Sequence, residues 1–287
     1  MTTPRGRLAR AALCLTPVLL LAACGGGGGG STPFLPVPPP APAPAPAPSP
    51  APAPRPKALV IGVDGVQYAA LQQALGDARM PALQGLGTLL PSYTGGVLGQ
   101  RTQQQATDGP SWATLLTGGW ADRHEIRSNY EGQAFGADTV FKLLKQRRAD
   151  TRSAVVASWS GLPQLLRTDK AAGYLELAKD CDGSDDCVST EAAGALESGG
   201  YDLVVADYQG PAQVADVAGY GTDYQNALAQ VDKQIATLRS ALARRRAAQP
   251  QEDWLVVVAT THGLGATGGA GGIPGAADPA TLPLNPS

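Results

Sequence analysis

Four short apolar runs constrain the fold of this chain most strongly. They contain no charged side chain and consist largely of β-branched residues, leucine and alanine, which is typical of strands buried on both faces: residues 58–63, 154–157, 203–206 and 254–259. Helical patterns, such as those at residues 139–148 and 224–246, lie between these runs. This alternation predicts an α/β fold in which helices sandwich a mostly parallel sheet.

Polar residues that could bind a ligand or take part in catalysis follow three of the four runs. Asp64 follows the first run, Asp207 the third, and the pair Thr261 and His262 the last. Because ligands of parallel sheets bind beyond the carboxyl ends of the strands, we expect these residues to gather along one edge. Asp64 before a glycine could also begin a turn, and His262 could be a hydrogen-bonded core histidine.

The N-terminus has the pattern of an export signal. Three arginines precede an apolar run, residues 11–23, which is shorter than the roughly 20 residues of a membrane-spanning helix. Residues 21–24, Leu-Ala-Ala-Cys, resemble a bacterial lipobox, in which the cysteine is acylated after cleavage. We therefore expect a signal peptide at residues 1–23 and a lipid anchor on Cys24, which would hold an exported protein in the bacterial cell envelope, at the outer membrane, with its domain in the periplasm or at the surface.

A tether and a single α/β domain are expected after the anchor. Residues 24–56 begin with a glycine run and continue in proline-alanine repeats, which favour extended polyproline II structure and cannot build a core. Residues 57–287 are long enough for one domain with a sizeable core. The formal net charge of -2 and the scattered basic residues give no indication of a nucleic-acid partner.

Two of the four cysteines belong to the expected domain. Cys181 and Cys187 flank a short acidic loop, and an exported protein lies in an oxidising compartment, so we expect them to form a disulfide. The carboxylates between them could instead hold calcium, although their spacing does not match a known calcium loop.

Several motifs resemble one enzyme family. These are Val-Asp-Gly at residues 63–65, a Gly-Pro-Ser-Trp segment that ends in Thr-Gly at residues 109–118, Asp-Arg-His at 122–124, and Asn129. In this order they resemble type I phosphodiesterases/nucleotide pyrophosphatases of the alkaline phosphatase superfamily. The resemblance implies an alkaline phosphatase-like fold, hydrolysis of phosphate esters or diesters, and paired zinc ions that clamp the attacking and leaving oxygens.

The same resemblance implies roles for individual residues. Asp64 matches the first metal-binding aspartate of the family. Asp108 occupies the position of the nucleophile, where the family has a hydroxyl residue, and Thr107 precedes it. Either Thr107 is the nucleophile, or Asp108 is a metal ligand or a carboxylate nucleophile, or catalysis is lost. The Asp108-Gly109-Pro110 segment could also be a purely structural turn.

The other metal ligands of the family are only partly present. Asp207, Asp216 and His262 are the candidates, while the chain has 2 histidines in all. A two-zinc centre needs several imidazoles, and His124 matches a family position that is not a ligand. An oxygen-rich site could instead hold one Mg²⁺, Mn²⁺ or Ca²⁺.

Two functions therefore remain open at this point. One is a membrane-tethered, metal-dependent hydrolase of small phosphate esters or diesters. The other is a catalytically inactive homologue that serves as a binding or interaction module in the envelope. The proline-rich end of the chain, residues 273–287, is shorter than the further strand and helix that the resemblance implies, so the domain could be truncated at its C-terminus.

Overall fold

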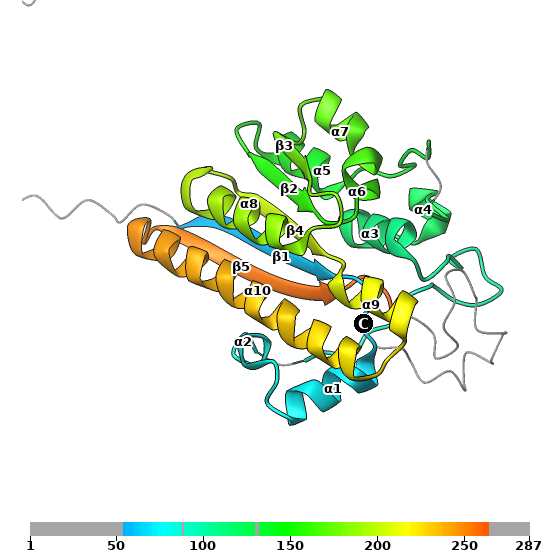
Figure 1. Ribbon diagram of the computed structural model, residues 1–287. Helices are drawn as coiled ribbons and strands as arrows, with labels where there is room; N and C mark the ends of the chain where they lie inside the picture. Colours follow the sequence, from blue (N-terminus) through cyan, green and yellow to red (C-terminus); the bar gives the residue numbers. More distant parts are fainter. Residues whose placement is uncertain (1–53, 88, 130–131, 264–287) are drawn as a thin grey trace, which may run out of the picture. The chain divides into compact units, whose positions relative to one another are not determined.

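The computed structural model describes residues 54–87, 89–129 and 132–263, all within one compact unit of the chain. Its strands are β1 (Arg55–Val63), β2 (Ser153–Ala157), β3 (Leu177–Asp180), β4 (Leu203–Tyr208) and β5 (Glu252–Thr260). They form one sheet in the order β3-β2-β4-β1-β5, and every pairing is parallel (Figure 1). The predicted parallel α/β fold is confirmed.

Ten helices connect or flank the strands among the described residues. They are α1 (Tyr68–Gly76), α2 (Pro81–Gln84), α3 (Asp108–Thr117), α4 (Ala121–His124), α5 (Val140–Arg147), α6 (Gly161–Leu165), α7 (Arg167–Ala171), α8 (Asp185–Ser198), α9 (Gly210–Ala218) and α10 (Thr222–Ala248). The helices expected at residues 139–148 and 224–246 correspond to α5 and α10. All four expected strands are present, and β3 is an additional one.

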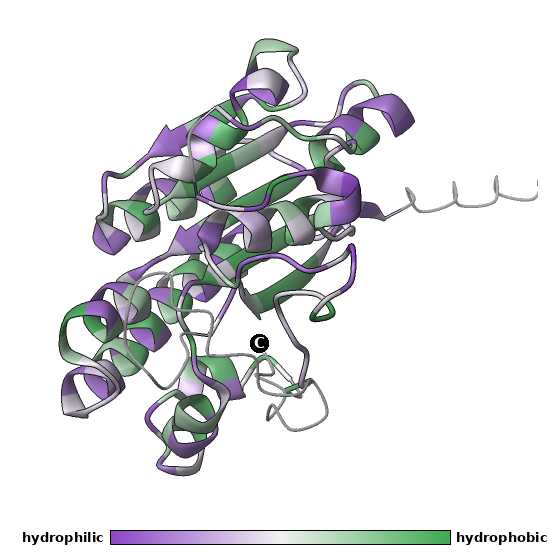
Figure 2. Cartoon of the chain, turned by 90° about the vertical axis from the view of Figure 1, so that its right-hand side faces the viewer, coloured by the Kyte–Doolittle hydropathy of each residue, from purple (hydrophilic) through white to green (hydrophobic). Residues whose placement is uncertain are grey.

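The inner strands β2, β4 and β1 are largely buried on both faces, as their composition predicts, whereas the edge strands β3 and β5 are partly exposed. Alternate residues of β1 enter two different cores, because successive side chains of a strand point to opposite faces. Leu59 and Ile61 pack in the core formed with α8 and α10, whereas Val60 packs in the core formed with α3, α5 and α6. Figure 2 shows the hydrophobic colouring concentrated on the strands between the two helical layers.

Several sequence-based expectations lie outside the described residues. These are the signal peptide at residues 1–23, the lipid acceptor Cys24, the tether up to residue 53, and the C-terminal residues 264–287. Strand β1 begins at Arg55, inside the segment expected to be the end of the tether. No helix in the described ranges is long and apolar enough to cross a membrane.

Candidate functional site

The carboxyl ends of three neighbouring strands carry the polar residues singled out in the sequence. Strand β1 lies between β4 and β5, with Gly62 aligned with Asp207 and Val63 aligned with Thr260. Asp64 follows β1 directly, and its backbone N–H donates to the carbonyl of Tyr208 at 2.8 Å. The parallel topology therefore brings Asp64, Asp207 and His262 to one edge, as expected.

Helix α3 brings Asp108 to the same edge. Trp112 of this helix is fully buried and packs directly over Gly62, where a Cβ atom would lie 2.3 Å from the indole ring. Gly62 thus permits a close approach of α3 to β1 that no other residue would allow. Asp108 is the first residue of α3, so this approach places its carboxylate near the end of β1.

Asp64, Asp108 and His262 form a group with the geometry of a cation site. Each offers one ligand atom, and these three atoms lie within 4.8 Å of one another. The Asp108 Oδ1 atom is 3.7 Å from His262 Nδ1. Asp64 and His262 are buried, while the Asp108 side chain is 15% exposed, so the group is reached from solvent on the Asp108 side.

The electrostatics of this edge are those of an uncompensated anionic site. Burial, together with repulsion from Asp207 and Asp108, raises the pKa of Asp64 well above its ordinary value. Burial is also the main cause that raises the pKa of Asp207 to about 8. Asp64 Oδ2 and Asp207 Oδ1 are buried without a hydrogen-bond partner among the described residues. Buried polar atoms are normally paired, so these two oxygens indicate that a cation or protons are bound at this edge.

His262 is held by its neighbour Thr261. The Thr261 hydroxyl donates a short hydrogen bond to Asp64 Oδ1, and the same oxygen lies 3.0 Å from His262 Nδ1. Burial lowers the pKa of His262, so that the neutral imidazole, the form that binds metals, prevails at neutral pH. The sequence placed Thr261 at this strand end together with His262 but assigned it no role at the site.

Asn129 fixes the other side of the group. Its side-chain amide donates to Asp108 Oδ2 at 3.0 Å, and its Oδ1 accepts from the backbone N–H of Gly109 at 2.7 Å. One oxygen of Asp108 is therefore occupied and the other is left on the side of His262. The sequence indicated Asn129 only as part of a family motif and gave it no role.

Thr107 is the residue immediately before α3. Its backbone is extended, as at a helix N-cap, yet its side chain makes no capping hydrogen bond. The Oγ1 atom is buried and has no partner among the described residues. A threonine at this position usually caps its helix, so the hydroxyl of Thr107 is free of its ordinary structural role.

Two other polar residues lie apart from the group. Asp216 is exposed on α9 and is not one of the three clustered residues, although its charge favours the protonated form of His262. His124 is fully buried; its Nδ1 accepts from the backbone N–H of Ile126 at 3.1 Å, and its Nε2 lies 3.1 Å from Gln104 Oε1. His124 is thus committed to structural hydrogen bonds, and His262 is the one histidine at the site.

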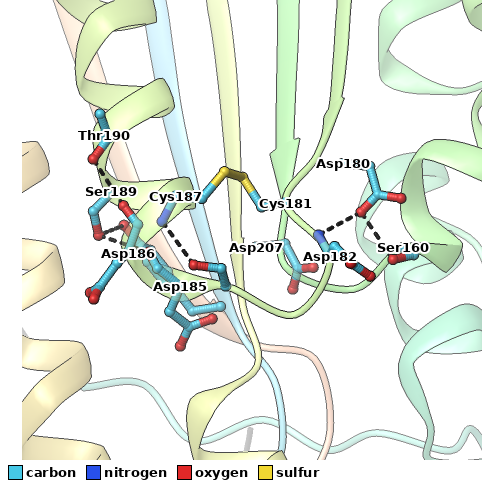
Figure 3. The surroundings of a disulfide bond; sticks show 12 residues. Ser160, Asp180, Cys181, Asp182, Asp185, Asp186, Cys187, Ser189, Thr190 and Asp207 are labelled. Carbon is cyan, nitrogen blue, oxygen red and sulfur yellow. Dashed lines mark hydrogen bonds between the residues drawn. A yellow bond between two sulfur atoms is a disulfide. The ribbon is translucent and has the colours of Figure 1, made fainter.

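The disulfide expected between Cys181 and Cys187 is present and closes the loop between β3 and α8 (Figure 3). At the start of α8, the carboxylate of Asp185 accepts from the backbone N–H groups of Gln209 and Gly210, which follow β4. The acidic loop therefore supports the segment just beyond Asp207. The described residues of this loop are not among the side chains that converge as Asp64, Asp108 and His262 do.

Solved structures resemble this arrangement at low sequence identity. Phosphonoacetate hydrolase from Sinorhizobium meliloti, in complex with phosphonoacetate, matches 74% of this chain and 57% of its own with a TM-score of 0.53 and 19% identity. An inactive variant of a murine ectonucleotide pyrophosphatase/phosphodiesterase, in complex with AMP, matches 72% of this chain and 57% of its own with a TM-score of 0.51 and 15% identity. A candidate sulfatase from Bacteroides thetaiotaomicron gives a TM-score of 0.53 at 14% identity, over 73% of this chain and 58% of its own. The chain has an alkaline phosphatase-like fold.

These matches extend over part of each solved structure. The chain spans less than two thirds of the length of the three proteins. No family model matches the sequence, and the search of curated proteins gives no match either. The comparisons therefore establish the fold, while the chemistry of the site depends on the residues described above.

The donor set fits one divalent cation and does not fit two zinc ions. Two carboxylates and one imidazole are a suitable donor set for a single cation. A cation bound there would also pair the buried oxygen of Asp64 that has no hydrogen-bond partner among the described residues. A second zinc ion would need further imidazoles, and His124 is engaged elsewhere.

Proposed function

We propose that this chain is a cation-dependent hydrolase of phosphate esters or diesters, with one divalent cation held by Asp64, Asp108 and His262. The observation that carries this proposal is the convergence of these three side chains within 4.8 Å at the carboxyl edge of the sheet. The alkaline phosphatase-like fold supports it, as do the phosphonoacetate and AMP bound in two of the similar structures.

The cation supplies a Lewis acid when it is bound, which stabilises negative charge on a phosphoryl group during transfer. The mixture of carboxylate and imidazole donors suits Mn²⁺ or Zn²⁺ better than Ca²⁺, which prefers oxygen ligands alone. Asp207 lies close enough to Asp64 to raise its pKa by repulsion.

We assign the nucleophile to Thr107 and leave Asp108 as a ligand. The Thr107 hydroxyl is buried, unpartnered and free of a capping role, whereas Asp108 is held by Asn129 with one oxygen toward His262. In the reaction, Thr107 Oγ1 gives its proton to solvent and bonds to phosphorus while the bond to the leaving oxygen breaks and the leaving group departs; water then cleaves the bond between phosphorus and Oγ1, which releases the phosphate product and restores the Thr107 hydroxyl. The backbone N–H groups at the start of α3 favour an anionic phosphoryl group beside it.

Hydrolysis of bis(p-nitrophenyl) phosphate by the purified full chain tests this proposal. The rate is measured with Mn²⁺, Zn²⁺ or Mg²⁺ and after chelation. Asp64→Asn and Thr107→Ala are expected to lose at least 100-fold in rate, whereas Asp253→Asn, an exposed carboxylate at the opposite end of β5, retains the wild-type rate. Turnover that is absent with every cation, or unchanged in Asp64→Asn, contradicts the proposal.

A non-catalytic binding module is the second candidate, and the shortage of imidazoles favours it. The sequence contains 2 histidines, and His124 is bound by Ile126 and Gln104. This candidate expects a folded protein that hydrolyses none of the phosphoesters offered and that contains no stoichiometric metal by elemental analysis. Metal-dependent turnover that is lost in Asp64→Asn excludes it.

We further propose that Cys24 carries a lipid that anchors the chain in the membrane of a bacterial envelope, with residues 24–56 as the tether. The Cys181–Cys187 disulfide is in keeping with an oxidising compartment. Expression of the full chain in a bacterial host, followed by membrane fractionation and mass spectrometry, should find the wild type acylated and membrane-bound. Cys24→Ser should be neither. An unmodified wild-type cysteine contradicts this part of the proposal.

A further inference from the structure

The outer edge of strand β5 has no partner strand among the described residues. β5 is the last strand in the order of the sheet, and it pairs with β1 on its inner side (Figure 1). At the two ends of this pair, the N–H of Arg55 donates to the carbonyl of Gln251, and the N–H of Thr261 donates to that of Val63. Because alternate residues of a strand bond to a given parallel neighbour, residues 253, 255, 257 and 259 bond to β1. The N–H and C=O groups of the residues between them face outward.

Two successive outward-facing residues, Val256 and Val258, have unpaired backbone groups. Their N–H and C=O groups make no backbone hydrogen bond to any described residue beyond this edge. The outward carbonyl of Trp254, by contrast, accepts from the guanidinium of Arg246 at 2.7 Å. A row of unpaired N–H and C=O groups on a strand edge is a template for another strand.

The side chains along this edge are apolar and partly exposed. Leu255 is 62% exposed and Val257 is 37% exposed. Residues 256–260 also line an apolar cleft of about 430 Å³, together with leucines of the segment 83–90. Native proteins usually protect an edge strand by charged residues, by proline or by a short length. Strand β5 has 9 residues, and after Asp253 it contains neither a charged residue nor a proline.

We propose that β5 forms a dimer interface, in which it pairs antiparallel with β5 of a second copy of this chain. The charges of the strand select this direction, because Glu252 and Asp253 lie at its start and the rest is uncharged. A parallel pair would place the carboxylates of the two copies side by side. The antiparallel pair places them at opposite ends, and this self-complementary contact closes a two-fold dimer. The inference does not depend on the proposed function.

One register of this pair satisfies both the backbone groups and the exposed side chains. With the two-fold axis at Val257, the N–H and C=O of Val256 meet the C=O and N–H of Val258 of the partner subunit. On the exposed face, Val257 lies beside Val257 of the partner subunit, and Leu255 lies beside Ala259 of the partner subunit. An axis at Val256 would instead use Trp254, whose carbonyl is already bonded to Arg246. A second copy thus supplies both the hydrogen bonds and the apolar contacts that the edge lacks.

Cysteine cross-linking of the full chain tests this register. Every variant carries Cys24→Ser, which removes the proposed lipid site, and the chain with this change alone is the parent. The two copies of residue 257 form a non-hydrogen-bonded antiparallel pair with Cα atoms about 4.5 Å apart, within reach of a disulfide. Val257→Cys should therefore give a disulfide-linked dimer on mild oxidation. Leu255→Cys is more exposed but lies opposite Ala259 of the partner subunit, so it should give no more dimer than the parent.

The mass of the parent in solution tests the interface itself. Light scattering after size-exclusion chromatography should find twice the mass of one chain. Val257→Lys and Val257→Glu each place like charges at the axis, so each should have the mass of one chain, and their equimolar mixture should return to twice that mass. The control Val217→Lys charges an exposed valine on α9 and should remain dimeric.

Three results overturn the inference. The first is a parent that has the mass of one chain up to nearly millimolar concentration, which would leave the edge to a different protein or to another segment of this chain. The second is a dimer that persists in Val257→Lys. The third is cross-linking of Leu255→Cys that equals that of Val257→Cys. The mass of the parent and the cross-links are decisive even if the charged variants do not fold.

Discussion

The carboxylate of Asp108 lies 3.7 Å from the imidazole of His262, measured between Oδ1 and Nδ1. This contact joins the first turn of α3 to the residues that follow β5, and Asp64 completes the group from the end of β1. Three segments that are distant in the sequence therefore meet at one point. Substitution of residues that contact the group should show which of them position its ligands.

Removal of the Asn129 side chain should weaken the site without unfolding the protein. Asn129→Ala loses the hydrogen bonds to Asp108 Oδ2 and to the N–H of Gly109, so the carboxylate is no longer fixed. Loss of such an outer contact typically costs a site roughly 10–100-fold in metal affinity. Titration calorimetry with Mn²⁺ measures this change.

The matched control for Asn129→Ala is Asn226→Ala, which removes an exposed amide that bonds to Arg79 on another part of the surface. Its Mn²⁺ affinity should equal that of the wild type. Equal affinity in Asn129→Ala as well would mean that Asn129 does not position Asp108.

Asp207 makes the stability of the cation-free protein dependent on pH. Burial raises its pKa from 3.8 to about 8, so between these values the folded protein binds more protons than the unfolded chain. The free energy of unfolding should therefore fall as the pH rises through this window. Asp207→Asn removes this titration, so its unfolding free energy should fall less than that of the wild type over the same pH window.

Urea denaturation with a chelator present, at about pH 5 and about pH 8, measures the effect of Asp207→Asn. The exposed Asp253→Asn serves as the control and should follow the wild type. The same pH dependence in Asp207→Asn and in the wild type would count against the raised pKa of Asp207.

The disulfide should stabilise the folded domain. Cys181 and Cys187 are separated by 6 positions, and closing a loop of that size stabilises a protein by about 2 kcal/mol through the entropy of the unfolded chain. Cys187→Ser, or the wild type treated with a reductant, should lose this amount in urea denaturation. The variant should then be insensitive to the reductant. A wild type whose stability does not respond to reduction would show that the bond is absent or has no net effect.

The sequence predicts much of the fold because its central strands are buried on both faces. Such strands require continuous apolar runs, and β1, β2 and β4 have them, while the edge strand β5 has such a run although it is partly exposed. Strand β3 was missed because its four residues are half-buried or exposed and end in a lysine and an aspartate, so they form no apolar run.

The part of the site that follows the strands was predicted because the topology of a parallel sheet decides where the strand ends lie. Strand ends in a parallel sheet must meet at one edge, so the approach of Asp64, Asp207 and His262 follows from topology. Asp216 is exposed on α9 and is not part of the group. The residues around it in the sequence do not indicate which way its side chain faces. The roles of Thr261 and Asn129 depend on side-chain hydrogen bonds between distant segments, and these are decided only by tertiary packing.

Binding of a divalent cation by the metal-free full chain is the most direct test of the account. Titration calorimetry with Mn²⁺ and with Zn²⁺ should find one high-affinity cation per chain in the wild type and in Asp253→Asn, and at least a 100-fold weaker one in Asp64→Asn. Absence of binding in the wild type, or equal affinity in Asp64→Asn, would contradict a cation site at Asp64, Asp108 and His262.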